Sequence, residues 1–71
     1  MALTATEFDL LEHLMRHRRQ VLRREQLLAE VWGYAAEVTT RTVDVHVAQL
    51  RAKLGDASPL RTVRGVGYAV D

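Results

Sequence analysis

The stretch RTVDVHVAQLRAKLG (residues 41–55) decides the fold class, because its apolar residues repeat at the spacing of an amphipathic helix. On a helical wheel of about 100° per residue, one face is formed by Val43, Val47, Leu50 and Leu54. We expect this face to pack on a core. Thr39 or Thr40 can cap the start of the helix, and Gly55 ends it.

The opposite face of this helix is a narrow ridge formed by Arg41, Val45, Ala48, Gln49 and Ala52. Its flanks carry Thr42, His46 and Lys53 on one side and Asp44 and Arg51 on the other. Such a ridge can enter a DNA major groove, where Val45 and the alanines meet thymine methyl groups, Gln49 reaches a base edge and the flanking cations meet phosphates. Alanine also favours helices in general, so the ridge alone leaves a DNA-binding helix and an ordinary solvated helix equally open.

Downstream of this helix, two short β-prone runs flank a turn rich in glycine. Residues 60–63 and 68–70 lie on either side of Arg64-Gly65-Val66-Gly67, whose glycines permit the positive φ of a tight turn. A β-hairpin is therefore expected. Arg64 in its turn can project into a minor groove beside the helix, although an exposed arginine in a turn also needs no function.

Two further helices are expected upstream. Thr4 followed by Glu7 has the spacing of a capping box and starts a first helix, whose C-terminal end carries Arg16, His17, Arg18 and Arg19. After an extended link at residues 21–22, residues 24–32 form a second helix that Gly33 closes. The expected fold is mainly α with a C-terminal β-hairpin, which is a three-helix winged helix-turn-helix.

The first helix carries apolar residues on two sides. Phe8, Leu11 and Met15 repeat at helical spacing and are expected to pack on the other helices, which leaves Leu10 and Leu14 facing water. Exposing them forgoes about 1.5 to 3 kcal/mol for each leucine. We therefore expect the isolated chain to associate with itself through these two leucines.

Length and composition limit the class of protein. The 71 residues suffice for one small domain, with 48% apolar residues for a core and 27% charged residues for a surface. No apolar run approaches the ~18 residues of a membrane helix and no secretory leader follows Met1, so a cytoplasmic location is expected. The absence of cysteine excludes disulfides, thiolate zinc sites and cysteine nucleophiles.

The net charge of +1 conceals an uneven distribution. Within residues 41–64, the basic residues Arg41, Arg51, Lys53, Arg61 and Arg64 outnumber the acidic residues Asp44 and Asp56. Phosphate attraction depends on the local surface, so this segment suits nucleic acid, although a solvated basic helix fits the charge alone equally well.

The best candidate for a metal or catalytic site is the pair His13 and His17, which lie one helical turn apart. Position 14 is leucine, so the glutamate of an HExxH zinc motif is missing, and no third ligand is evident. The two histidines are expected to be solvated. We expect no metal, no cofactor and no enzymatic activity.

These residues resemble a known family, the winged-helix effector domains of OmpR/PhoB-type two-component response regulators. Besides residues 41–55, the resemblance rests on LTATEFDLLEHLMRH (3–17), VLRREQLLAEVWG (21–33) and LRTVRGVGYAV (60–70), so it covers nearly the whole chain. It implies sequence-specific binding of promoter DNA, as a tandem dimer on direct repeats, after a sensor kinase phosphorylates a separate receiver domain. The family's effector domains open with a small antiparallel sheet that this sequence lacks before its first helix. Residues 1–71 are therefore expected to be the DNA-binding domain of a longer response regulator, or else a pruned relative of the family.

Position by position, the resemblance implies phosphate contacts by Trp32, Arg41, Thr42, His46, Arg51 and Thr62. It implies a minor-groove contact by Arg64, and it places the loop at residues 34–38 where family members meet RNA polymerase. Many members carry arginine where this chain has Ala48 and Gln49, so Gln49 is expected to be the polar base reader. Arg23 stands where the family often has a serine that caps the second helix, which implies a weaker helix start.

The alternative is a winged helix that docks on proteins and does not bind DNA, because a fold does not guarantee a function. A docking module would be expected to expose aromatic residues where this chain has Arg41, Arg51 and Arg64.

Overall fold

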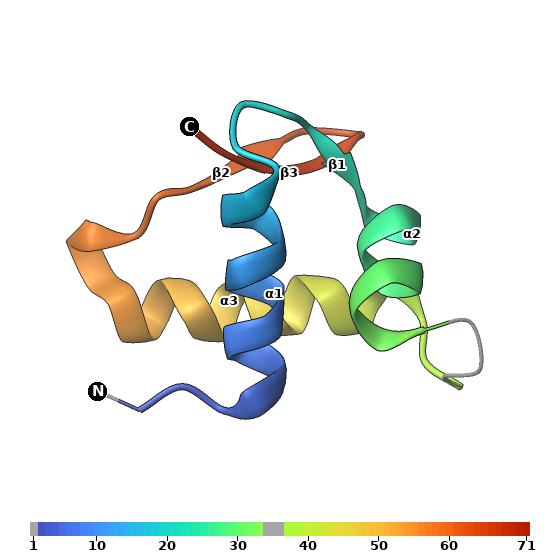
Figure 1. The fold of residues 1–71 in the computed structure, drawn as a ribbon, viewed down its shortest axis with the longest axis horizontal. Helices are drawn as coiled ribbons and strands as arrows, with labels where there is room; N and C mark the ends of the chain where they lie inside the picture. The colour runs from blue at the N-terminus through green and yellow to red at the C-terminus, as the bar shows by residue number, and fades with distance from the viewer. Residues whose placement is uncertain (1, 34–36) are drawn as a thin grey trace.

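The computed structural model describes residues 2–33 and 37–71. Its elements in chain order are α1 (Ala5–Arg16), β1 (Leu22–Arg23), α2 (Arg24–Leu27), η1 (Leu28–Trp32), α3 (Thr40–Leu54), η2 (Gly55–Ala57), β2 (Leu60–Val63) and β3 (Gly67–Val70). The helices lie beneath a small sheet, with α3 crossing behind α1 (Figure 1). The predicted fold of three helices and a C-terminal hairpin is confirmed. No helix in the described ranges is long and apolar enough to cross a membrane.

The predicted capping box starts α1. The backbone N–H of Glu7 donates to Oγ1 of Thr4 at 3.2 Å, and the N–H of Thr4 donates to Oε1 of Glu7 at 2.8 Å. The two bonds satisfy amides that a helix start leaves without partners. The third helix also spans the predicted residues, but the side chain of Thr39 makes no capping bond to it.

The second predicted helix is divided in two. α2 forms one regular turn after Arg23, whose side chain makes no capping bond, as expected for arginine. The chain then widens into η1, a π-helical segment in which the N–H of Gly33 donates to the carbonyl of Leu28 at 3.1 Å. This wider turn ends at Trp32, whose ring packs against α3. The centroid of the Trp32 ring lies 5.1 Å from that of the His46 ring.

The sheet contains one strand more than the sequence indicates. Its order is β1-β3-β2, with both pairs antiparallel, and β1 pairs Leu22 with Tyr68 and Arg23 with Gly67. A Cβ atom on Gly67 would overlap the carbonyl oxygen of Leu22, so only glycine permits this close approach. Leu22 of the extended link expected at residues 21–22 thus belongs to a strand that anchors the hairpin, and Val21 lies just before that strand.

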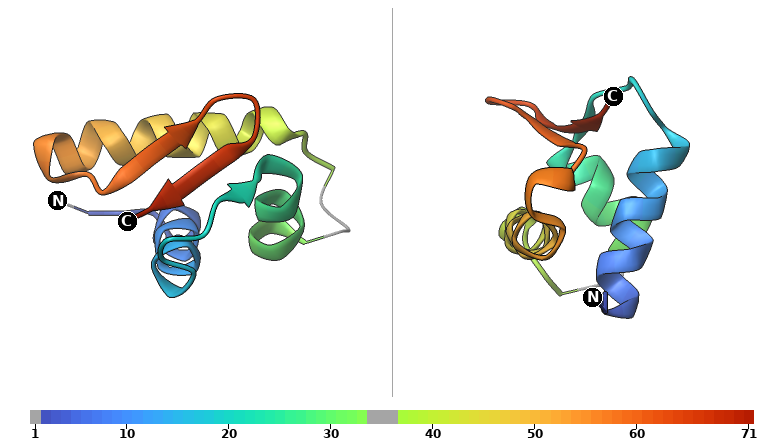
Figure 2. Two further views of the ribbon diagram at one scale, coloured as in Figure 1. Left: turned by 90° about the horizontal axis from the view of Figure 1, so that it is seen from above. Right: turned by 90° about the vertical axis from the view of Figure 1, so that its left-hand side faces the viewer.

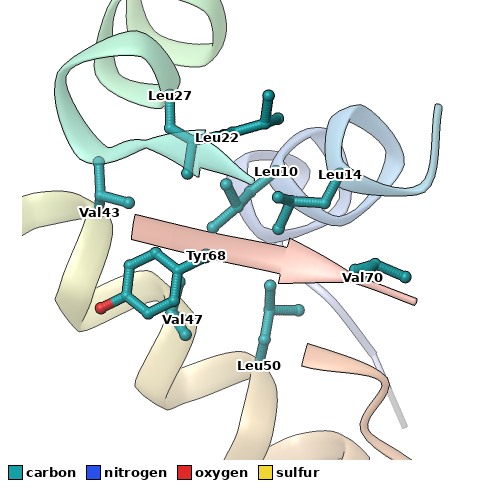
Figure 3. Close-up of a cluster of buried hydrophobic side chains, with 9 residues drawn as sticks. All are labelled: Leu10, Leu14, Leu22, Leu27, Val43, Val47, Leu50, Tyr68 and Val70. Carbon is teal, nitrogen blue, oxygen red and sulfur yellow. The ribbon is translucent and has the colours of Figure 1, made fainter. Parts of the chain in front are cut away.

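The core lies between the sheet and the helices. Its buried side chains are Leu10, Leu14, Leu22, Leu27, Val43, Val47, Leu50, Tyr68 and Val70 (Figure 3). The apolar face predicted for the third helix is confirmed, since three of its four residues are buried and Leu54 is half-buried.

The predicted orientation of α1 is wrong. Leu10 and Leu14 are 0% and 1% exposed, whereas Phe8 and Met15 are 53% and 42% exposed. The inward face contains a carboxylate, Glu7, at helical spacing from both leucines, and a charged residue on this face hides its apolar periodicity. Self-association through Leu10 and Leu14 therefore loses its basis.

Candidate nucleic-acid interface

The outward face of α3 forms the candidate interface. Arg41, Ala48, Gln49 and Ala52 are exposed, and Val45 is 46% exposed, so the predicted ridge, which we call the α3 ridge, is open to solvent. The hairpin of β2 and β3, which we call the wing, reaches out on the same side of the molecule as α3, with α1 on the other side (Figure 2). The fold thus presents a helix and a hairpin turn to one ligand.

The turn of the wing has the predicted geometry. The N–H of Val66 donates to the carbonyl of Val63 at 3.0 Å, and Gly65 has a φ of 75°, which glycine adopts without strain. Arg64 is exposed, and Val66 beside it is 44% exposed. In the described part of the chain, no carboxylate lies within ion-pair distance of Arg64 or Arg41, so both guanidinium groups are available to an external anion.

One flank of the ridge unites three of the predicted phosphate-contacting residues. The ring of His46 meets that of Trp32 edge-on, with centroids 5.1 Å apart, and Nδ1 of His46 lies 2.8 Å from the carbonyl oxygen of Thr42. All three side chains are half-buried. Packing between η1 and α3 therefore holds them in place before any ligand arrives.

The other flank unites Arg51 and Thr62. Nη2 of Arg51 donates to Oγ1 of Thr62 at 2.6 Å and to the carbonyl oxygen of Leu60 at 3.4 Å, which ties α3 to β2. The guanidinium also lies 5.8 Å from the centroid of the Tyr68 ring. The two predicted phosphate-contacting groups are thus neighbours on the flank that faces the wing.

Lys53 does not belong with the other predicted DNA-binding residues. Its Nζ donates to Oε1 of the buried Glu7 at 2.5 Å and to the carbonyl oxygen of Ala2 at 3.2 Å. The ammonium group is therefore held against the start of α1 and its charge is compensated. We do not retain Lys53 in the interface.

A hydrogen-bond network that sequence reasoning missed lies beneath the wing. The carboxylate of Asp44 accepts bonds from Nε and Nη2 of Arg24, at 3.0 and 2.6 Å, and from the hydroxyl of Tyr68 at 2.7 Å. Burial, and then the hydrogen bond to Asp44, raise the pKa of Tyr68. The sequence signal was weak, because Asp44 lies on a flank of its helix and its partners are 20 and 24 residues away.

A groove of about 440 Å³ lies between the wing and the helical part of the protein, next to this network. Its walls include Arg23, Arg24 and Asp44 from the helical part and Thr62, Val66 and Tyr68 from the hairpin. The turn end of the wing is held by β1, whose Arg23 pairs with Gly67 directly after the turn.

The two histidines of α1 are engaged within the protein. Nε2 of His13 lies 2.5 Å from Oε1 of Glu30, and Nδ1 of His17 lies 2.8 Å from the carbonyl oxygen of His13. The hydrogen bond from His13 lowers the pKa of Glu30. Within residues 2–33 and 37–71, no three His, Asp or Glu side chains are grouped as a metal site would require.

The loop assigned to RNA polymerase contact lies partly outside the described residues, because these exclude residues 34–36. Glu37 and Val38, at its end, are exposed.

Known proteins resemble the chain in both sequence and structure. A family model described as "Transcriptional regulatory protein, C terminal" matches residues 1–70. The response regulator ArlR of Staphylococcus saprophyticus is 52% identical over 71 residues, which cover 96% of this chain and 32% of that protein. The chain thus spans about a third of the length of the curated relatives it matches.

Two solved structures extend the likeness to the fold. The DNA-binding domain of Bacillus subtilis CssR matches with a TM-score of 0.89 at 37% identity, covering 99% of this chain and 78% of that one. The Klebsiella pneumoniae RstA DNA-binding domain, solved in complex with the RstA box, matches with a TM-score of 0.84 at 36% identity, covering 97% of this chain and 72% of that one.

Proposed function

Because the chain belongs to the family of transcriptional regulatory protein C-terminal domains, we propose that it binds double-stranded DNA sequence-specifically as the output domain of a two-component response regulator. This is the OmpR/PhoB family that the sequence indicates. In the proposed complex, α3 enters the major groove and residues 64–67 of the wing enter the adjacent minor groove.

The observation that carries this proposal is that α3, with its exposed ridge, and the wing lie on the same side of the molecule (Figure 2). A major groove about 12 Å wide admits a helix, and small residues such as Ala48 and Ala52 let the helix axis approach the bases. Arg64 at the wing turn is exposed and free of internal ion pairs among the described residues, as a minor-groove contact requires.

The residues take different parts in this proposal. Phosphate contacts are assigned to Trp32, Arg41, Thr42, His46, Arg51 and Thr62 on the two flanks of the ridge. Val45 is assigned to a thymine methyl group, and Gln49 to a base edge in the major groove. Phosphate contacts set the register of the protein on the duplex, whereas Gln49 and Arg64 carry the sequence and shape readout.

The protein-docking alternative is less well supported by this surface. The α3 ridge carries no aromatic residue, and its exposed apolar side chain, Val45, is small. Exposed arginines beside such a ridge suit a phosphate backbone better than the apolar centre of a protein interface.

The partners of the longer protein are further proposals. They are promoter DNA bound as a tandem dimer on direct repeats, RNA polymerase reached through the loop at residues 34–38, and a sensor kinase acting on a receiver domain outside this chain. The ArlR relative is named a response regulator and is about three times as long, which supports a receiver elsewhere in the protein. A cytoplasmic location belongs to the same proposal.

The direct test is selection of bound duplexes from a random pool, followed by a salt titration on the selected site. We expect a log-log slope of about −4 to −5, from about four to six phosphates neutralised per protomer. Arg41→Ala should make the slope shallower by about one. Arg18→Ala, which removes an exposed charge beyond the end of α1, is the matched control and should leave it unchanged. An affinity independent of salt would contradict the proposal.

A further inference from the structure

The carboxylate of Asp44 is shared by two elements that meet α3 from different directions. Nε and Nη2 of Arg24, the first residue of α2, donate to its two oxygens at 3.0 and 2.6 Å. The hydroxyl of Tyr68 in β3 donates to Oδ1 at 2.7 Å. Asp44 therefore joins the recognition helix both to the helix before it and to the central strand of the sheet.

The wing has a second connection to α3, formed by Arg51. Its guanidinium donates to Thr62 in β2 at 2.6 Å and lies 5.8 Å from the centre of the Tyr68 ring. Asp44 thus holds β3, and Arg51 holds β2. Among the described residues, no hydrogen bond connects the turn at residues 64–66 to α3. The orientation of the turn relative to α3 therefore depends on these two connections, on the pairing of β1 with β3 and on the core.

We propose that Asp44, through the hydroxyl of Tyr68, is a positioning residue that sets the angle of the wing on α3. This bond then helps to set the distance between the α3 ridge and Arg64. The consequence for DNA rests on the proposed function: the bond fixes how far apart the major-groove and minor-groove contacts lie on one duplex. Asp44 itself need not touch DNA for this role.

The chemistry of the pair suits a permanent connection at neutral pH. A tyrosine ordinarily loses its proton near pH 10, and the pKa of Tyr68 is raised above that value, so its hydroxyl stays protonated and able to donate. Arg24 donates to both oxygens of the Asp44 carboxylate, including the Oδ1 that accepts from Tyr68, and this two-point contact fixes the orientation of the carboxylate.

The first test needs no DNA. The chain has no cysteine, so nitroxide labels can be attached at Val66→Cys in the wing turn and Ala52→Cys on α3, both exposed positions. Tyr68→Phe, which removes the hydroxyl and keeps the ring, should broaden or shift the distance distribution measured by double electron–electron resonance. Asp44→Ala, which removes the acceptor of this bond, should do the same. An unchanged distribution in both variants, with melting curves showing that they are folded, would overturn the inference.

Arg61→Ala is the matched control for the distance measurement. Arg61 also lies in the wing and forms an ion pair with Asp71 at 2.9 Å, but this pair does not reach α3. Breaking it should leave the distribution unaltered. A shift as large as that of Tyr68→Phe would show that the wing responds to any lost contact, which would overturn a specific role for Asp44.

The second test measures the consequence for recognition. Two duplexes share one selected major-groove site and differ only in an A·T or G·C minor-groove flank. Tyr68→Phe should reduce the affinity ratio between these flanks by about threefold, while affinity for the G·C duplex stays within about twofold of the wild type. Equal losses on both duplexes would overturn the inference. If the wild-type chain binds neither duplex, the proposed function fails, and the distance measurement still decides the role of Asp44.

Discussion

Nζ of Lys53 lies 2.5 Å from Oε1 of Glu7, so the last turn of α3 is fastened to the first turn of α1. Glu7 is 1% exposed and is the buried charged residue of the described chain. The same carboxylate oxygen accepts the backbone N–H of Thr4 in the capping box. One side chain therefore starts a helix and joins it to another.

This pairing predicts acid sensitivity. The hydrogen bond from Lys53, followed by that from the Thr4 N–H, lowers the pKa of Glu7 from 4.5. The unfolded chain then binds the proton more readily, so stability from Glu7 is present above about pH 4.5 and is lost as the pH falls through the lower folded-state pKa. Glu7→Gln should lower the melting temperature at pH 7. The melting temperature of this variant should then decrease less than that of the wild type as the pH falls.

Glu12→Gln is the control for this experiment. Glu12 forms an exposed pair with Arg16 at 3.7 Å, which contributes little. Removing this pair should leave the fall of the melting temperature at acid pH as it is in the wild type. If the melting temperature falls equally steeply with acid in Glu7→Gln and in the wild type, other carboxylates cause the acid sensitivity.

The orientation of α1 can be checked by truncating one residue on each face. Leu10→Ala removes a fully buried side chain and should cost about 2 to 5 kcal/mol in the free energy of unfolding. Phe8→Ala removes a larger side chain that is 53% exposed and should cost less than Leu10→Ala. Urea denaturation measures both, and a larger loss for Phe8→Ala would contradict the observed packing.

Arg51 on α3 and Arg64 in the wing turn should contribute differently to DNA binding. Arg64→Ala should weaken binding mainly where the flanking minor groove is a narrow A·T tract, because its role is assigned to groove shape. Arg51→Ala should weaken binding to all sequences alike, because its role is assigned to a phosphate. Equilibrium binding to matched A·T and G·C flanks separates them, and equal patterns for both variants would reject this division.

Gln49 should read one base pair. Glutamine can bond to adenine through two hydrogen bonds, so Gln49→Ala should cost about 1 to 3 kcal/mol at one adenine-containing position and little elsewhere. Repeating the selection of duplexes with the variant measures this. If every base preference of the wild type survives the change, Gln49 is not the reader.

The start of α2 offers a gain in stability. Arg23 occupies the cap position with extended φ and ψ angles of −71° and 153° and makes no capping bond. Arg23→Ser should supply the missing acceptor and stabilise the fold by about 0.5 to 1 kcal/mol. Arg18→Ser, outside any helix, controls for the lost charge in thermal melts. A lower melting temperature for Arg23→Ser would indicate that the arginine makes a compensating contact.

The fold was predictable where one local signal dominated. The apolar stripe through Val43 and Val47, the Thr4–Glu7 capping box and the hairpin around Gly65 each depend on neighbours within a few residues. β1 was not predictable, because a strand of two residues has no period and its partner Tyr68 lies far along the chain. The inward face of α1 was missed because Glu7 lies on it.

The candidate site divides in the same way. Exposure of Arg41, Gln49 and Arg64 follows from their positions on a helix and in a turn. The engagement of Lys53 and the link from Asp44 to Tyr68 depend on how helices and strands cross. Such crossings are fixed by packing among distant residues, which a pattern in one segment does not contain.

The place of β3 in the sheet also has a consequence for the order of folding. β3 comes after β1 and β2 in the sequence, yet it lies between them in the sheet. Its residues Tyr68 and Val70 complete the core. Until residues 67–70 arrive, neither neighbouring strand has a partner, and the entropy cost of closing the long loop from Leu22 to Tyr68 precedes any gain. We therefore expect this domain to fold in one cooperative step, only after residues 67–70 have left the ribosome.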